Sequence, residues 1–334
     1  MIKQWSDISE HYGNTLVVGN GGSVAIDPCF SYDSLLDKAR ELNLITANLQ
    51  KVFDHVDDTN DFELVMNMIW HTQHVNRALE IEEEMSKQAY RDVRQALVQT
   101  VRAIHAPYET ASPHLPALSS FMRRFKTVVS MNYDLIVYWA MLVGNNEHGN
   151  WFKDCFVDGV FREDWRGLRS PYGASGATLV FYPHGNLILA SGLSGEAIKV
   201  SVSHDFVNLL DTVVQVWESG KYFPLFVSEG STKQKTDAIN RDHYLQTVLH
   251  DVVPSLQGTV VVYGWSLSEN DQHVLRRLLS PSTTRIAVSI WTGDKDEGDL
   301  EAEIEEKTKL IQSINKNLAI DFFDSQSAGS WIYT

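Results

Sequence analysis

Short apolar runs rich in β-branched residues recur along the chain, and stretches with helical patterning separate them. Several runs are apolar on both faces, which is typical of strands buried between two layers of helices. The runs lie at residues 15–18, 126–131, 178–182, 186–190, 224–228, 259–263 and 285–291. Helices are expected near 31–43, 133–143, 203–219, 232–250, 268–280 and 297–314. This alternation predicts an α/β fold with a parallel sheet flanked by helices.

The segment from about residue 42 to 125 departs from this alternation, because it shows helical periodicity and no strand pattern. Two stripes follow the i, i+3, i+4, i+7 spacing of one helix face. They comprise Phe62, Val65, Met66, Ile69 and Trp70, and then Tyr90, Val93, Leu97, Val101 and Ile104. The acidic run at 80–84 between them fits a solvated helix face, and prolines at 107, 113 and 116 end the helices. We therefore expect a helical insertion at 42–125 that forms a smaller domain, and a sheet domain made of 1–41 and 126–334.

The first apolar run leads into a glycine-rich turn, Gly19-Asn20-Gly21-Gly22-Ser23. Glycine lets a ligand approach the backbone, and N–H groups at the start of the next helix can hold a pyrophosphate. No Gly-Lys-Ser/Thr follows, which excludes a P-loop, and Pro28 ends the helix and leaves 27–33 as a loop. A tight strand-to-helix turn without a ligand would use the same residues, so the motif needs support from elsewhere.

Polar residues also follow other predicted strands. Asn132 comes directly after the second run, with Asp134 two residues later, and the 178–182 run leads to His184-Gly185. Ligands of open parallel sheets bind outside the carboxyl ends of the strands, so these groups would share a cleft with the glycine turn. Taken singly, Asn132 fits a helix N-cap, Asp134 a partner of the helix dipole and His184 a loop histidine.

A further strand ends in Gly264-Trp265-Ser266, with Asp271 a few residues on. Gly264 permits close approach of a ligand, and Ser266 or Asp271 could bond a ribose. The alternative is an ordinary strand–turn–helix connection in which Ser268 caps the helix.

Composition narrows the classes of partner. The 43 acidic and 28 basic side chains give a formal charge of −15, which disfavours binding to nucleic acid or to an anionic membrane surface. The two cysteines cannot build a four-thiolate zinc site or a disulfide framework. No apolar run reaches the ~18 residues that span a bilayer, and the first residues lack the apolar core of a signal peptide. We therefore expect a cytoplasmic protein without membrane contact.

In their order, these motifs resemble the sirtuin superfamily, specifically the sirtuin-like NAD-consuming domains of bacterial anti-phage defence. The shared features are a Gly-x-Gly-x-Ser loop, a strand ending in Asn-x-Asp, a His-Gly pair and a late Gly-x-Ser with an aspartate nearby. In this chain they are Gly19–Ser23, Asn132–Asp134, His184-Gly185 and Gly264–Ser266 with Asp271. The likeness spans most of the chain outside the insertion and residues 142–176.

The resemblance implies a Rossmann-like NAD-binding domain and a role for each matching residue. Asn132 and His184 would be the catalytic pair. The remaining positions would contact NAD, with Gly19, Asn20, Gly21 and Ser23 on the phosphate side, Asp134 in the central pocket, and Gly264, Ser266 and Asp271 toward the adenosine.

Two departures argue against protein deacylation, the activity of the zinc-containing sirtuins. Two cysteines cannot supply their four-cysteine module, and Asp27-Pro28-Cys29-Phe30 replaces their Pro-Asp-Phe-Arg. The expected activity is hydrolysis of NAD to nicotinamide and ADP-ribose, with NAD as substrate and no metal. The alternatives are ADP-ribosyl transfer and a non-catalytic module that binds NAD or ADP-ribose.

Because an unregulated NAD hydrolase would deplete its own cell, we expect control by homo-oligomerisation or by a separate sensor protein. Other residues suggest less. His71 and His74 have helical spacing but lack a third metal ligand, and Lys233 and Lys235 fit solvated residues at a helix start. The glycine-rich segment 142–176 is expected to be irregular, either as a lid over the pocket or as an assembly surface.

Overall fold

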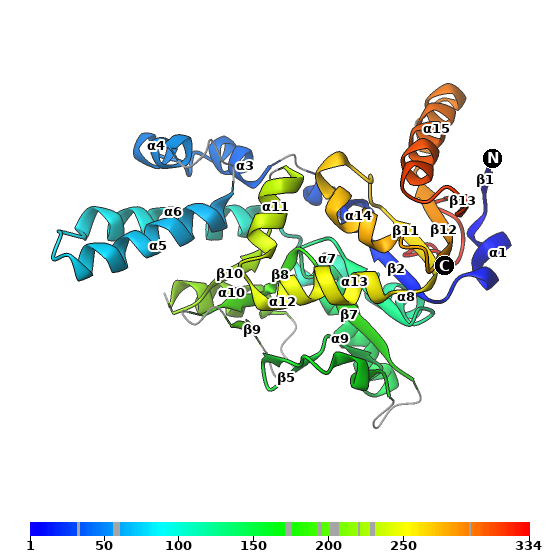
Figure 1. Cartoon of the computed structure of the whole chain (residues 1–334), viewed down its shortest axis with the longest axis horizontal. Helices are drawn as coiled ribbons and strands as arrows, with labels where there is room; N and C mark the ends of the chain where they lie inside the picture. The colour runs from blue at the N-terminus through cyan, green and yellow to red at the C-terminus, as the bar shows by residue number, and fades with distance from the viewer. Residues whose placement is uncertain are drawn as a thin grey trace.

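An eight-stranded sheet with every pairing parallel forms the centre of the protein (Figure 1). The computed structural model describes residues 1–31, 34–55, 61–170, 176–192, 196–200, 207–219, 221–227, 231–293 and 295–334. The strand order is β1 (Ile2–Lys3), β13 (Ala319–Asp324), β12 (Thr283–Ile290), β11 (Gly258–Tyr263), β2 (Thr15–Val18), β3 (Thr127–Ser130), β7 (Thr178–Phe181) and β4 (Phe152–Lys153). The predicted α/β fold with a Rossmann-like parallel sheet is confirmed.

Register aligns the ends of the central strands. Tyr263 pairs with Val18, and Val18 pairs with Ser130, so β11, β2 and β3 end at the same level. The central strands β2, β3 and β7 are buried along their whole length. This explains why their sequences are apolar on both faces apart from threonine or serine at the strand ends, and why the amide, carboxyl and imidazole side chains of the predicted site come after the strands.

Helices follow most of the strands. They are α1 (Trp5–Ile8), α2 (Asn20–Val24), α3 (Leu35–Glu41), α9 (Ile136–His148), α10 (Leu209–Glu218), α11 (Thr232–Ile239), α12 (His243–Thr247), α13 (Val253–Ser255), α14 (Gln272–Leu278) and α15 (Glu297–Ile314). The helix expected at 133–143 begins only at Ile136, because Asp134 accepts a hydrogen bond from its N–H and holds the preceding residues in a turn. Among the described residues, no helix has the length and apolar character needed to span a membrane.

Two of the predicted strands lie outside the parallel sheet. β8 (Gly185–Ser191) and β10 (Phe223–Phe226) belong to a smaller sheet with β9 (Ala197–Lys199), β6 (Val160–Phe161) and β5 (Phe156–Val157). All its pairings are antiparallel. Only residues 182–184 separate β7 from β8, which is too short for the crossover that a parallel neighbour requires. Gly185, with φ of +73°, redirects the chain at this point.

The described residues of the expected insertion are helical, as predicted. They form α4 (Ala47–His55), α5 (Phe62–Ala78), α6 (Glu84–Ile104), α7 (Tyr108–Ala111) and α8 (Leu115–Met122). Both predicted apolar stripes face inward, since all their residues are buried except Trp70, which is half-buried. The α5–α6 hairpin extends to one side of the molecule, whereas α8 packs near the sheet through Phe121, whose ring contacts Trp5 and Trp331 (Figure 1).

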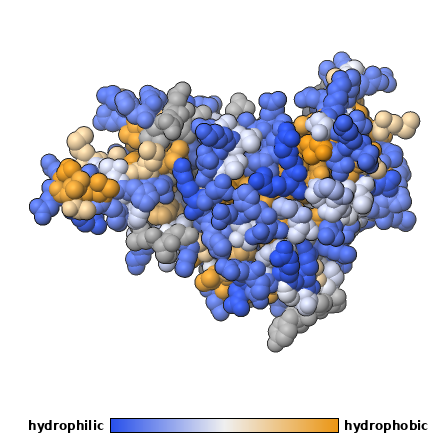
Figure 2. All heavy atoms as spheres, in the orientation of Figure 1, coloured by the Kyte–Doolittle hydropathy of each residue, from blue (hydrophilic) through white to orange (hydrophobic). Residues whose placement is uncertain are grey.

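The acidic run at 80–84 is not a helix face. It forms the loop between α5 and α6, and only Glu84 enters a helix. Large apolar side chains are exposed near this loop, including Leu79, Ile81 and Met85. Figure 2 shows apolar residues gathered at this end of the molecule.

The segment 142–176 supplies structure rather than a loose excursion. Its described residues end α9, add β4 to the edge of the parallel sheet, and add β5 and β6 to the smaller sheet. Trp165 is buried against Phe181 of β7. The glycine at 173 lies outside the described residues.

The C-terminal segment, which shows no clear motif, closes the structure behind the glycine turn. β13 places Asp321 among Lys3, Tyr12 and Arg285, so an acidic residue interrupts what would otherwise be an apolar strand pattern. Further on, the buried indole of Trp331 stacks on Tyr263 and donates a hydrogen bond of 2.7 Å to the carbonyl of Gly22. Trp331, close to the end of the chain, therefore supports the turn after β2.

Candidate functional site

A cavity of about 830 Å³ opens along the carboxyl edge of the parallel sheet. The cavity is lined by every predicted site residue except Ser23, which is fully buried beneath it. These lining residues are Gly19, Asn20, Gly21, Asn132, Asp134, His184, Gly264, Ser266 and Asp271. The two predicted catalytic side chains, Asn132 and His184, thus share one pocket.

The strand order arranges this pocket as a row. His184 follows β7, Asn132 follows β3, the glycine turn follows β2, and Gly264 follows β11. The last of the row is β12, at whose end Ser289 and Trp291 also line the cavity. Four strand spacings separate β7 from β12, or about 19 Å, so the site suits an elongated ligand with two chemically different ends.

Close backbone contact joins the two glycine turns. The N–H of Gly21 donates to the carbonyl of Gly264 at 2.7 Å, and the N–H of Gly22 donates to the carbonyl of Gly19 at 2.9 Å. A Cβ at Gly264 would collide with the backbone of Gly21 and Gly22, and its φ of +65° favours glycine. Since these two N–H groups are already used, the turn offers a ligand close approach more than free donors.

Three buried polar side chains connect the glycine turn to the end of β3. Asn132 donates from Nδ2 to the carbonyl of Gly19 at 3.0 Å and to Oγ of Ser23 at 2.9 Å. Ser23 in turn donates to Oδ2 of Asp134 at 2.5 Å, while Oδ1 of Asp134 accepts from the N–H of Ile136. The hydrogen bonds of the Asn132 side chain within the described structure use its nitrogen, which leaves Oδ1 for a ligand.

Burial dominates the protonation of Asp134. It raises the pKa of this carboxyl to about 6, although the hydrogen bonds from Ser23 and from the N–H of Ile136 oppose the rise. At neutral pH Asp134 is therefore mostly ionised, and its carboxylate accepts the hydrogen bond from the hydroxyl of Ser23. The oxygen of Ser23 in turn accepts a hydrogen bond from the amide of Asn132 and orients it.

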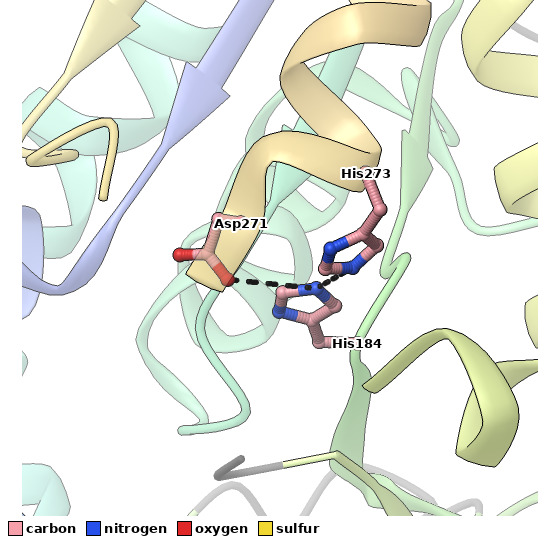
Figure 3. Close-up of side chains that lie close together, drawn as sticks. All are labelled: His184, Asp271 and His273. Atoms are coloured by element: carbon pink, nitrogen blue, oxygen red, sulfur yellow. Dashed lines mark hydrogen bonds and ion pairs between the residues drawn. The ribbon is translucent and has the colours of Figure 1, made fainter. Parts of the chain in front are cut away.

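His184 belongs to a buried cluster that the sequence does not reveal. Its Nε2 lies 2.9 Å from Nε2 of His273, at the start of α14, and 4.0 Å from Oδ1 of Asp271 (Figure 3). Burial lowers the pKa of His184 to about 3 and that of His273 to about 4. Two neutral rings joined through Nε2 share one proton along that edge, so they hold complementary tautomers. Figure 3 shows the other ring nitrogen of His184, Nδ1, on the side away from His273.

Lys235 completes this cluster. The sequence analysis placed it among solvated lysines, but it is buried, and its Nζ lies 2.8 Å from Oδ1 of Asp271. Burial alone would raise the pKa of Asp271, but His184 in its protonated form, the charge of Lys235, and hydrogen bonds from Lys235 and Trp265 lower it below its usual value. Because His184 is neutral, Lys235 is the cation that balances this carboxylate at neutral pH.

The same cluster offers the ligand types of a metal site. One ligand atom from each of His184, Asp271 and His273 lies within 4.8 Å of the others, and two histidines with a carboxylate can hold a divalent ion. Each of these atoms already has a partner, however, because the two Nε2 atoms bond each other and Oδ1 of Asp271 accepts from Lys235. The arrangement therefore fits a chain of hydrogen bonds better than a metal ion.

The structure also shows where Asn20 and Asp271 lie. Asn20 donates from its side chain to the carbonyl of Phe30 and so holds the loop that follows α2. Asp271, expected near the adenosine, lies beside His184 instead. His71 and His74 both pack their rings against Trp70 of α5, away from this pocket.

Sequence reasoning missed a group of residues on and before α15. Lys295, Glu303 and Lys307 line the pocket beyond Gly264 and Ser266. The sequence of the acidic stretch 294–306 predicts an exposed turn and helix face, and no local pattern distinguishes Glu303 from its neighbours. Of the described residues in 142–176, none lines the pocket, so they form no lid over it.

Comparison with known proteins gives one family. The profile of a family described as a domain of unknown function (DUF4917) matches residues 16–331. The match includes every residue of the site described above. No curated protein matches the chain.

We expect Gly264→Ala to lower the free energy of unfolding by more than about 1 kcal/mol, because the new Cβ would meet the backbone of Gly21 and Gly22 at positive φ. Urea unfolding measures the change. Gly167→Ala is the control, since a Cβ there has no neighbour within 4 Å. Equal stabilities of the two variants would contradict the proposed packing of the turns.

His184 should make the protein sensitive to acid. Because burial lowers its folded pKa to about 3, the unfolded chain binds more protons below about pH 6.5, and stability falls with pH. His184→Gln should therefore reduce the loss of unfolding free energy between pH 7 and pH 5 by about 1–2 kcal/mol. Urea unfolding at both pH values measures this loss, with the exposed His11→Gln as the control. An unchanged loss in His184→Gln would show that His184 titrates normally.

Proposed function

The chain belongs to the DUF4917 family, and we propose that it is an NAD glycohydrolase. The reaction cleaves the nicotinamide–ribose bond and yields nicotinamide and ADP-ribose. One observation supports this proposal above the others. Asn132 and His184, the pair implied by the resemblance to sirtuin-like domains, line the same pocket as the two glycine turns.

The chemistry asks little of acid catalysis, because nicotinamide leaves as a neutral molecule. Water attacks the anomeric carbon, the carbon–nitrogen bond breaks, and its electron pair stays on the nicotinamide nitrogen. The protein must hold the ligand so that water reaches the sugar, support the positive charge that develops there, and accept one proton.

His184 is suited to accept that proton. In the proposed state, Nε2 of His184 carries a proton and donates a hydrogen bond to His273. Nδ1 is unprotonated and faces the substrate. Because burial lowers the pKa of His184 to about 3, the ring is neutral at physiological pH. As water attacks the anomeric carbon and releases its proton to Nδ1, the carboxylate of Asp271, 4.0 Å from Nε2, stabilises the imidazolium that forms.

Asn132 is suited to orient the attacking water or a ribose hydroxyl. Its Nδ2 is fixed by Gly19 and Ser23, which determines where Oδ1 lies. An amide does not titrate, so Asn132 keeps this orientation at neutral pH, where Asp134 is ionised. Ser23 and Asp134 act through Asn132 and are positioning residues.

We expect His184→Ala to lower the rate of NAD cleavage by about 100- to 10,000-fold, the usual contribution of a general base, and Asn132→Ala to lower it by about 100-fold. Chromatography of the products after incubation with NAD measures the rate. Calorimetric binding of ADP-ribose checks that each variant is folded, and His11→Ala is the matched histidine control. Normal turnover by His184→Ala would refute its role.

The product pattern separates the alternatives. Free ADP-ribose supports hydrolysis. Label that appears on protein or nucleic acid would indicate ADP-ribosyl transfer, and binding of NAD without consumption, even by the assembled protein, would indicate a regulatory module.

We also propose that the activity is restrained, as expected of a defence effector that would otherwise deplete the NAD of its own cell. Control would come from assembly into a homo-oligomer or from a separate sensor protein. Size-exclusion chromatography with activity measured in each fraction tests the first route, and we expect activity to follow the larger species. A fully active monomer would contradict any such restraint.

A further inference from the structure

We propose that Glu303 accepts a hydrogen bond from the 2′-hydroxyl of the adenosine ribose and thereby selects NAD over NADP. The inference rests on the proposed function, which it extends by naming the substrate. It concerns the end of the pocket opposite His184, where the side chains of Trp291, Lys295, Glu303 and Lys307 converge.

Position is the first argument. Gly264 and Ser266 follow β11, and Trp291 follows β12, four strand spacings from the strand that carries His184. With the nicotinamide ribose beside Asn132 and His184, an extended dinucleotide would cross the two glycine turns. Its second ribose would then lie near β11 and β12, where Glu303 of α15 lines the cavity.

Charge is the second argument. Oε2 of Glu303 lies 2.6 Å from Nζ of Lys295, and Oε1 lies 3.4 Å from Nζ of Lys307. Lys307 is buried and also donates to the carbonyl of Ser266 at 2.9 Å. The carboxylate is thus held between two ammonium groups and tied to the turn after β11. Its remaining lone pairs can accept hydrogen bonds from a ribose diol.

A carboxylate at this place disfavours a 2′-phosphate, because the two anions repel each other and the lysines are already paired. Acidic side chains read the 2′-hydroxyl in other dinucleotide sites by the same logic, whereas basic side chains accommodate the phosphate. If Glu303 lost its charge, no carboxylate would balance the ammonium groups of Lys295 and Lys307, and Lys295 would be free to bind an anion. One side chain therefore decides which nucleotide fits.

Trp291 gives the base a surface. Its ring lines the pocket and lies against Gly293, where a Cβ would collide with it, yet the residue is 49% exposed. A large aromatic ring that stays half-exposed at the rim of a nucleotide pocket can stack on adenine, which would anchor the ligand beside Glu303.

Calorimetric binding tests the inference without turnover. The probes are ADP-ribose and ADP-ribose 2′-phosphate, which differ only at the group that Glu303 would read. We expect the wild-type protein to bind ADP-ribose at least about tenfold more tightly. In Glu303→Gln, which keeps the shape and removes the charge, the 2′-phosphate ligand should gain about tenfold or more, and ADP-ribose should lose a few-fold.

Glu305→Gln is the matched control, because Glu305 also pairs with a lysine on α15 but is exposed outside the pocket. It should leave both affinities unchanged. Equal discrimination by wild type and Glu303→Gln, or a wild-type preference for the 2′-phosphate, would overturn the inference alone. Discrimination without cleavage of NAD, even by the assembled protein, would support Glu303 and argue against hydrolysis. Failure of both probes to bind the wild type would overturn both proposals.

Discussion

The buried hydrogen bonds among Ser23, Asn132 and Asp134 are the constraint on which the site depends. They join the turn after β2 to the end of β3 and hold the amide of Asn132 between two strands of the sheet. Leaving any of these groups buried without a partner would cost about 1–3 kcal/mol, so the three side chains stabilise one another's positions. The pocket edge is rigid at its centre because polar groups, and not apolar packing alone, hold it.

The charge of the site differs from that of the chain. Although the net charge is −15, the cations that line the pocket lie beside carboxylates, Lys235 with Asp271 and Lys295 and Lys307 with Glu303. The two ends of the cavity therefore differ in their local charge. Around His184 the imidazoles are neutral and one carboxylate, Asp271, pairs with one lysine. At the other end, the carboxylate of Glu303 lies between two lysines. A ligand whose two ends differ chemically suits such a pocket better than a symmetrical one.

Much of the fold and the centre of the site could be predicted, because both follow from local rules. Strands apolar on both faces predict a parallel sheet, and parallel strands bring their ends together, so Gly19, Asn132 and His184 were expected to meet. Lys235 and Glu303 reach the pocket from helices, and His273 reaches His184 from another; only the tertiary packing of those helices brings them there. The antiparallel pairing of β8 was also missed, since its apolar pattern is the same in either kind of sheet.

The indole of Trp331 has a consequence for how the protein is made. It supports the carbonyl of Gly22 from a position more than three hundred residues later in the chain, and β13 pairs with β1 across a similar interval. During synthesis, the glycine turn emerges long before its support does. A nascent polypeptide therefore lacks a finished pocket until residue 331 has left the ribosome, which separates the onset of any activity from the folding of the first half of the sheet.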